Sequence, residues 1–202
     1  VLRAELGALE ERGLKRDLAD RFEQRRATAP EDLSRLAAWR LDSGGEVECA
    51  VLLTAGRLSL MGRDSASAVR FAQAAAERGA PHDASRILVE AAALRSDRAA
   101  AEAAVESVWD DPTLVDSHRA HLSRRLALAR FAAGDLAGAL AITEQAAGVV
   151  TEPHAVAAVQ AQRAQLLGTA GRPYETLRVL DESGDDLDHD PRVRVQRCNA
   201  RS

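Results

Sequence analysis

The chain is poor in aromatic residues and cysteine, and it has no long hydrophobic run. Only 3% of its 202 residues are Phe, Trp or Tyr, and Cys49 and Cys198 stand 149 residues apart, outside any Cys-x-x-Cys spacing. A disulfide framework is therefore not expected. No apolar stretch approaches the roughly 20 residues of a membrane-spanning helix, and no signal-peptide pattern opens the chain. We expect a cytoplasmic protein without membrane contact.

The charge balance is weak as well. The formal net charge is −4, and Lys15 is the only lysine among 27 basic residues. This balance lacks the dense positive field that counters a nucleic-acid backbone. Two explanations account for the excess of arginine. One is a role in anion recognition; the other, which is simpler, is a GC-rich genome, which would also account for the many alanines.

Alanine is what the sequence has in plenty, at about a fifth of the residues. It has the best helix propensity, and its small side chain lets helices approach closely. Leu122, Leu126, Ala129 and Ala133 follow steps of four, three and four, which is one stripe of a helix. No segment shows the apolar–polar alternation of a strand. The sequence predicts an all-α fold.

Four turn signals recur along the chain, and each separates two helical runs. They are Gly62-Arg63-Asp64, Arg95-Ser96-Asp97, Ala133-Gly134-Asp135 and Ala170-Gly171-Arg172, at intervals of 33, 38 and 37 residues. Five residues after each central position stands Ala68, Ala101, Ala139 or Thr176. A period in the thirties with two helices per unit is typical of a helical-hairpin solenoid. We expect each of these small residues where its two helices cross most closely.

The predicted architecture is a right-handed solenoid of about four tetratricopeptide-like hairpins, preceded by a short helical N-terminal segment. Residues 1–29 form that segment, in which Gly13 is predicted to separate two short helices. Residues 30–202 form the array, with units at about 46–79, 82–110, 113–150 and 153–183 and a truncated fifth unit from 190. Because the chain opens on Val1 and stops inside a helical pattern, we expect a piece of a longer protein.

Two resemblances to known families accompany this pattern. Residues 134–140 (GDLAGAL), with Glu144, Ala146 and Ala147, resemble the tetratricopeptide repeat, although the aromatic positions and the inter-repeat proline of the strict motif are missing. Residues 14–22 (LKRDLADRF) and 32–45 (DLSRLAAWRLDSGG) resemble the large ATP-binding LuxR-type transcriptional regulators of actinobacteria. These regulators are similar to the MalT class of signal-transduction (STAND) ATPases.

The second resemblance implies a position within a larger switch. In that family a P-loop NTPase module and a winged-helix segment precede a helical repeat array, and a helix-turn-helix closes the chain. Residues 1 to about 26 would end the winged-helix region, and the remainder would belong to the array. The chain has no GxxxxGK[ST] run, so the backbone cradle that holds nucleotide phosphates is missing. ATP and DNA would therefore be bound only by parts of the parent outside this chain.

No constellation of residues predicts catalysis. His118 and His121 lie three apart on one helix near Asp116, but third and fourth zinc ligands at suitable spacing are missing, so a solvated pair is favoured. The acidic tract of residues 181–190 lacks EF-hand spacing and is interpreted as a solvated linker. The basic run from Arg12 to Arg26 is interleaved with Asp and Glu, which favours an ion-paired helix face over a nucleic-acid site. We expect no enzyme activity, metal or cofactor.

The candidate partner-binding residues are Trp109, His118 and His121. Trp109 stands before Asp110-Asp111-Pro112, where a helix end would lie at the edge of the array, although a tryptophan is more often a packing residue. The predicted function is a non-catalytic sensor or interaction domain of a LuxR-type regulator. Its inner helices, those before each turn, would line a groove that binds an inducer or a partner protein. A stand-alone tetratricopeptide-like adaptor and an accessory helical domain of an enzyme are the alternatives.

Overall fold

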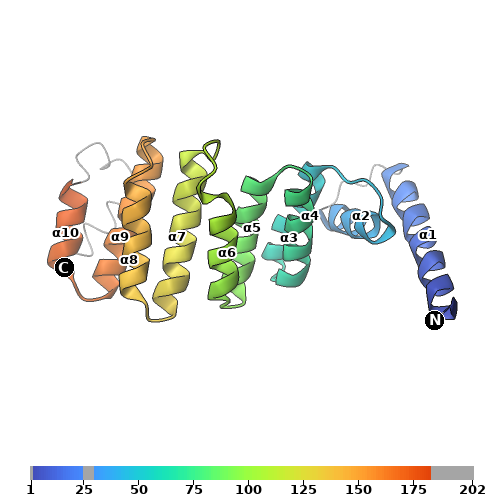
Figure 1. The fold of residues 1–202 in the computed structure, drawn as a ribbon, viewed down its shortest axis with the longest axis horizontal. Helices are drawn as coiled ribbons and strands as arrows, with labels where there is room; N and C mark the ends of the chain where they lie inside the picture. Colours follow the sequence, from blue (N-terminus) through green and yellow to red (C-terminus); the bar gives the residue numbers. More distant parts are fainter. Residues whose placement is uncertain (1, 25–29, 183–202) are drawn as a thin grey trace. The chain divides into compact units, whose positions relative to one another are not determined.

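The computed structural model describes residues 2–24 and 30–182, and all regular structure in these ranges is α-helical (Figure 1). The helices are α1 (Leu2–Gln24), α2 (Pro30–Ser43), α3 (Cys49–Met61), α4 (Ser65–Glu77), α5 (Pro81–Leu94), α6 (Arg98–Trp109), α7 (Asp116–Ala132), α8 (Leu136–Ala147), α9 (Pro153–Thr169) and α10 (Pro173–Glu182). The all-α prediction is confirmed. The expected fifth unit, Cys198 and nearly all of the acidic tract lie outside the described residues.

The chain divides into two compact units, Val1–Leu94 with α1 to α5 and Arg95–Ser202 with α6 to α10. This boundary falls inside the second expected repeat, 82–110, whose first helix belongs to one unit and whose second helix belongs to the other. The predicted change from N-terminal segment to array near residue 29 stays a prediction.

All four turn signals adopt the same backbone conformation. The central residues Arg63, Ser96, Gly134 and Gly171 have φ of 58°, 54°, 83° and 73°. This left-handed region reverses the chain direction at a helix end and costs glycine little. In the first three turns, the following aspartate then caps the next helix: Asp64, Asp97 and Asp135 accept hydrogen bonds from the amides of Ser67, Ala100 and Gly138. At the fourth turn Arg172 stands in the aspartate's place and pairs with Glu175.

The small residues after the turns are buried, which is consistent with the predicted close crossing of the two helices. Ala68, Ala101 and Ala139 are 0% exposed and Thr176 is 1% exposed. Two hairpins show the close crossing directly. The Cβ position of Gly56 on α3 lies 3.7 Å from the carbonyl oxygen of Ala68 on α4. On the last hairpin, the Thr176 hydroxyl donates to the carbonyl of Ala164 at 3.4 Å. A larger side chain at these positions would separate the paired helices.

The first unit begins with a hairpin of α1 and α2 that is held by charges and aromatic packing. Trp39 and Phe22 meet edge to face at 5.3 Å between ring centroids. The Arg40 guanidinium lies 2.7 Å from Asp20 and 2.6 Å from Glu23 across the hairpin. The ion-paired interpretation of the basic run is confirmed at Lys15, whose partners are described next; Arg25 and Arg26 lie outside the described residues.

Asp42 at the end of α2 joins three helices of the first unit. It accepts a hydrogen bond from Lys15 of α1 at 2.7 Å and another from Arg70 of α4. Burial alone would raise the pKa of Asp42, but the hydrogen bonds and charges of these two cations outweigh burial and hold the pKa below its ordinary value. Lys15 also pairs with Glu11 one turn earlier on α1.

The predicted break at Gly13 is wrong, because α1 runs without interruption from Leu2 to Gln24. Glycine inside a helix costs only about 1 kcal/mol relative to alanine, so favourable neighbours can override it. Here the Glu11–Lys15 ion pair spans the glycine at a separation of four residues, and Lys15 is also tied to α2. The N-terminal pattern of two short helices is therefore one long helix.

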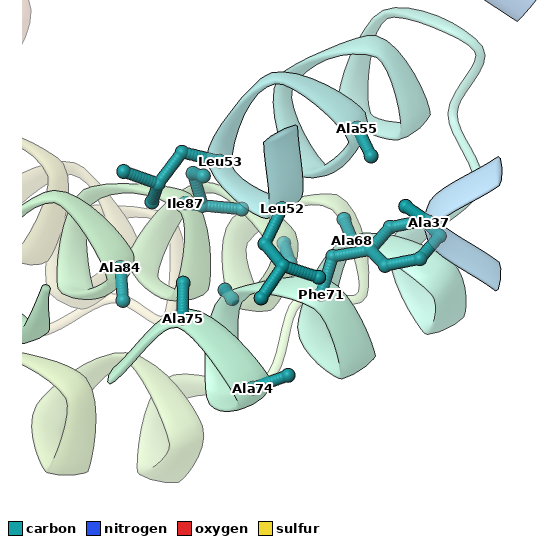
Figure 2. Packing of buried hydrophobic residues seen from close by; sticks show 12 residues of the cluster. Ala37, Leu52, Leu53, Ala55, Ala68, Phe71, Ala74, Ala75, Ala84 and Ile87 are labelled. Atoms are coloured by element: carbon teal, nitrogen blue, oxygen red, sulfur yellow. The ribbon is translucent and has the colours of Figure 1, made fainter. Parts of the chain in front are cut away.

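The core of the first unit lies among α2, α3, α4 and α5. Figure 2 shows Leu52, Phe71 and Ile87 among the small side chains of this cluster. Leu52 and most of the alanines are fully buried, and Phe71 and Ile87 are each 3% exposed. Because alanine fills so many of the core positions, one aromatic ring and a few branched side chains provide most of the bulk.

In the second unit the first helices of two successive hairpins, α7 and α9, lie in contact, and α8 packs against both. A carboxylate clamp fixes the start of this arrangement. Asp116 at the first turn of α7 accepts hydrogen bonds from the amides of Thr151, at 2.6 Å, and Glu152, at 2.9 Å, before α9. These two bonds lower the pKa of Asp116. Glu152 in turn caps α9.

Candidate partner-binding cleft

A cleft of about 300 Å³ opens in the second unit between α6, α7 and α8. Helix α6 supplies most of its lining. The lining residues are Glu102, Val105, Glu106, Trp109 and Asp110 of α6 and its C-terminal cap, Leu126 and Arg130 of α7, and Ile142 and Gln145 of α8. Two of these three helices, α6 and α8, follow a turn, so the cleft differs from the groove of first helices that the sequence predicts. That groove stays a prediction.

The floor of the cleft is apolar. Val105 and Leu126 are 5% and 3% exposed, and Ile142 is half-buried. Trp109 is also half-buried and packs against a cluster that includes Ala120 and Val159. The sequence therefore placed Trp109 correctly at a helix end, and the structure shows that it both packs and lines a cleft.

Arg119 of α7 fixes the position of Trp109. Its guanidinium lies 5.7 Å from the centroid of the Trp109 ring, a cation–π distance. The same side chain donates to the carbonyls of Trp109, Asp111 and Leu114. One arginine thus satisfies the end of α6 and holds the loop that follows it, which keeps the indole ring preorganised at the cleft.

One wall of the cleft is a stripe of carboxylates. Glu102, Glu106 and Asp110 follow each other at steps of four residues, so they share one face at the edge of α6. Glu102 is neutralised by Arg130, whose Nη2 lies 2.9 Å away, and Arg98 is 3.9 Å from the same oxygen. Glu106 and Asp110 are exposed, and neither forms an ion pair with a described residue.

Gly138 allows the Arg130 network to form. A Cβ atom at this position would lie 2.7 Å from Arg130 Nη1 and 2.1 Å from Asp135 Oδ2, far inside van der Waals contact. The missing side chain therefore leaves room for the N-cap carboxylate of α8 and for the guanidinium beside it. Sequence reasoning included Gly138 in the tetratricopeptide resemblance but did not recognise this steric role.

The two candidate histidines lie elsewhere on α7. His118 and His121 are half-buried in the first half of that helix, and each has an interaction partner. The residues that α7 contributes to the cleft, Leu126 and Arg130, come one to three turns later. The structure thus brings Trp109 to the cleft but not the histidine pair, whose part in partner binding stays a prediction.

A second, larger cleft of about 710 Å³ lies in the first unit. It is bordered by α1, α2, the start of α3 and the end of α4, and its charged lining includes Glu23, Arg40, Glu48 and Arg78. The Cys49 thiol at its edge donates to the carbonyl of Arg78 at 3.2 Å.

Two kinds of site are missing from residues 2–24 and 30–182. Among these residues no group of three or more His, Cys, Asp or Glu side chains is arranged to hold a metal ion. No helix there combines the length and apolar character needed to cross a membrane.

Comparison with known proteins identifies the fold. No model of a protein family matches the chain, and no curated protein matches it. Among solved structures, a thermophilic tetratricopeptide-repeat (TPR) protein of Thermus thermophilus is similar, with a TM-score of 0.57. The two share 17% sequence identity, over 97% of this chain and 98% of the other. At this identity the likeness shows the fold alone: the chain has an all-α, TPR-like helical-repeat fold.

Proposed function

We propose that this chain is a non-catalytic interaction module that binds a partner protein through its helical hairpins. The observation that supports this most strongly is the cleft of the second unit, where an apolar floor with a preorganised tryptophan meets carboxylates without ionic partners among the described residues. Tryptophan is enriched among the residues that dominate binding energy at interfaces. In helical-repeat proteins each repeat packs only on its neighbours, and the exposed faces of the repeats together form an extended surface for a partner.

Site-specific photo-crosslinking tests this proposal. A photoreactive amino acid replaces Gln145 in the cleft, Gln165 on α9 or Gln73 on α4, three exposed positions on different helices. We expect irradiation of cells that produce the full-length protein to give a covalent protein adduct from at least one position. If all three positions give none, the chain is not an interaction module. ATP hydrolysis by the purified chain would contradict its non-catalytic assignment.

We further propose that the module is the cytoplasmic sensor arm of a LuxR-type, STAND-class transcriptional regulator. The support is the resemblance of residues 14–22, which fall on α1, and of residues 32–45, which cover most of the paired helix α2 and the two residues after it. Binding would change the parent's activity only through a difference in affinity between its resting and DNA-binding states. The reading frame on both sides tests this. A Walker A motif upstream and a helix-turn-helix downstream are expected, and their absence would leave a stand-alone adaptor or an enzyme's accessory domain.

A small-molecule inducer is the second candidate ligand, and the cleft of the first unit favours it. Its volume of about 710 Å³ falls in the range of about 300–1,000 Å³ that is usual for small-molecule sites. Val51 lines this cleft and is half-buried, so Val51→Trp should occupy part of the cleft and obstruct a ligand that packs against this wall. In a thermal-shift screen of metabolites, an inducer should stabilise the natural chain but not Val51→Trp. A compound that stabilises both equally binds elsewhere.

A further inference from the structure

The carboxylate stripe on α6 is unfavourable for the stability of its own helix. Like charges four residues apart repel each other, at about 0.2–0.5 kcal/mol per pair in isolated helices. Acidic groups near a helix C-terminus also oppose the helix dipole, and Asp110 is the C-cap of α6. Glu102 is compensated by Arg130, whereas Glu106 and Asp110 have no described basic partner. Local rules are broken most often where a residue serves function.

These two carboxylates border an apolar floor whose dimensions suit a few side chains of a bound polypeptide. From Glu102 to Asp110, α6 advances about 12 Å at 1.5 Å per residue. Along this length Val105 and Trp109 face the cleft one turn apart, opposite Ile142 of α8. A volume of about 300 Å³ is at the lower limit for a complete small-molecule ligand, but it is large enough for a few side chains of a polypeptide.

We propose that the cleft between α6, α7 and α8 docks a segment of a partner protein that carries an aliphatic side chain close to an arginine or lysine. The aliphatic side chain packs on Val105, Trp109 and Ile142. The basic group pairs with Glu106 and Asp110. This inference rests on the proposed interaction function and adds to it the site and the chemistry of the partner.

Charge complementarity selects this occupant. Glu106 and Asp110, which form no ion pair with a described residue, repel anions. Arg130, the one basic side chain among the described residues that line the cleft, is already paired with Glu102 and lies 3.7 Å from Asp135. Arg119 beside Trp109 is engaged by the carbonyls at the end of α6. A polar ligand without an apolar group would leave the floor exposed to water. A segment that is both basic and aliphatic complements the acidic wall and the apolar floor together. Positive charge on the partner also accelerates its encounter with an acidic site.

Selection from a random library tests the chemistry even though the partner is unidentified. The probe is a display library of random twelve-residue peptides, selected on the immobilised full chain. We expect the enriched sequences to share an aliphatic residue within a few positions of Arg or Lys. One enriched peptide, labelled with fluorescein, is then measured by anisotropy against the natural chain and against Glu106→Lys, Asp110→Lys and Asp181→Lys. Asp181 is the matched control, because it is exposed at the far end of α10 and outside the cleft.

Each outcome decides the proposal. Glu106→Lys and Asp110→Lys should each weaken the peptide about tenfold or more at low salt, whereas Asp181→Lys should change its affinity less than twofold. Replacing the peptide's aliphatic residue by serine should weaken binding similarly. The inference is overturned by a library without enrichment, by acidic enriched sequences, or by equal effects of all three variants. Self-association that Glu106→Lys abolishes would show a second copy as the occupant, again against the proposal.

Failure here leaves the broader proposal separately testable. If no basic aliphatic peptide binds while crosslinking from Gln165 or Gln73 captures a protein, the chain is an interaction module that uses another surface. If neither experiment detects binding, the interaction function itself fails.

Discussion

Replacing Ala139 by leucine tests the packing on which the hairpins depend. Ala139 is 0% exposed and lies in a cluster with Ala127 and Leu166, against which Phe131, Leu136, Leu140 and Ile142 also pack. It stands on α8, and Ala127 stands on α7, the other helix of the same hairpin. Leucine adds three carbon atoms at a position where no solvent-facing space remains.

The expected cost follows from this burial. Inserting extra methylene groups into a packed core forces backbone shifts or strained rotamers, usually at about 1–3 kcal/mol. For a cooperative chain of 150–250 residues, 1 kcal/mol lowers Tm by about 2–4 °C. Ala139→Leu should therefore melt roughly 2–12 °C below the natural chain. The matched control is Ala137→Leu, on the same helix but exposed, which should stay within about 0.5 kcal/mol.

Two probes locate the damage. Far-UV circular dichroism reports all helices, whereas the two tryptophans report one unit each, because Trp39 packs on α1 in the first unit and Trp109 lines the cleft in the second. In a Trp39→Phe background, Ala139→Leu should shift the urea midpoint of Trp109 fluorescence to lower concentration. An unchanged midpoint, or an equal loss from Ala137→Leu, would refute the proposed helix crossing.

Three further predictions concern glycine, acid and the clamp on α7. Gly13→Ala should stabilise the chain by about 0.5–1 kcal/mol, since Gly13 lies inside α1 and a Cβ there would meet no atom within 4 Å beyond the adjacent backbone of its own helix. Gly134→Ala should destabilise the chain by about 1–2 kcal/mol, since φ there is +83°, and calorimetry compares the two variants. The pKa of Asp42 is held below its ordinary value of 3.8. The ionised Asp42 therefore contributes to stability above pH 3.8, and this contribution disappears as the pH falls through the lower pKa of the folded state. Asp42→Asn should be less stable than the natural chain near neutral pH and should lose less stability on acidification, as urea titrations at several pH values will show. Asp116→Asn should lower Tm and accelerate hydrogen exchange at the Thr151 amide, and unchanged exchange would contradict the clamp.

The turns and helices were predictable because each has a local cause. At Arg63, Ser96 and Gly134 a residue with positive φ ends one helix, and the aspartate that follows caps the next helix. Of these three residues only Gly134 is a type that favours positive φ, so at Arg63 and Ser96 the following aspartate was the local signal. Gly13 misled the prediction for the opposite reason. Besides the local Glu11–Lys15 pair, the part of α1 that follows Gly13 is held by Lys15 donating to Asp42, a contact between residues 27 positions apart that no local window includes.

The cleft could not be predicted as a site, because three separate helices form it. Its carboxylate stripe was nevertheless visible in the sequence as Glu102, Glu106 and Asp110 at steps of four. Such a stripe is unfavourable in a helix unless a basic partner compensates it, and that conflict was the available signal. The role of Gly138 had no such signal, since it follows from where the Arg130 side chain lies.

The repeats are more regular in burial than in residue type. Nine residues after the turn positions, the side chains are Ala72, Val105, Thr143 and Leu180, and all four are buried. Seven residues before them stand Gly56, Val89, Ala127 and Ala164, also buried. Glycine, alanine, valine, threonine and leucine thus occupy equivalent places in different hairpins. Family models score residue identities, so a chain that keeps the burial pattern while varying the residues can share a TPR-like fold and still match no model. Packing constrains the buried face of each hairpin, whereas exposed positions, among them Glu106 and Asp110 at α6, are free to differ from one hairpin to the next.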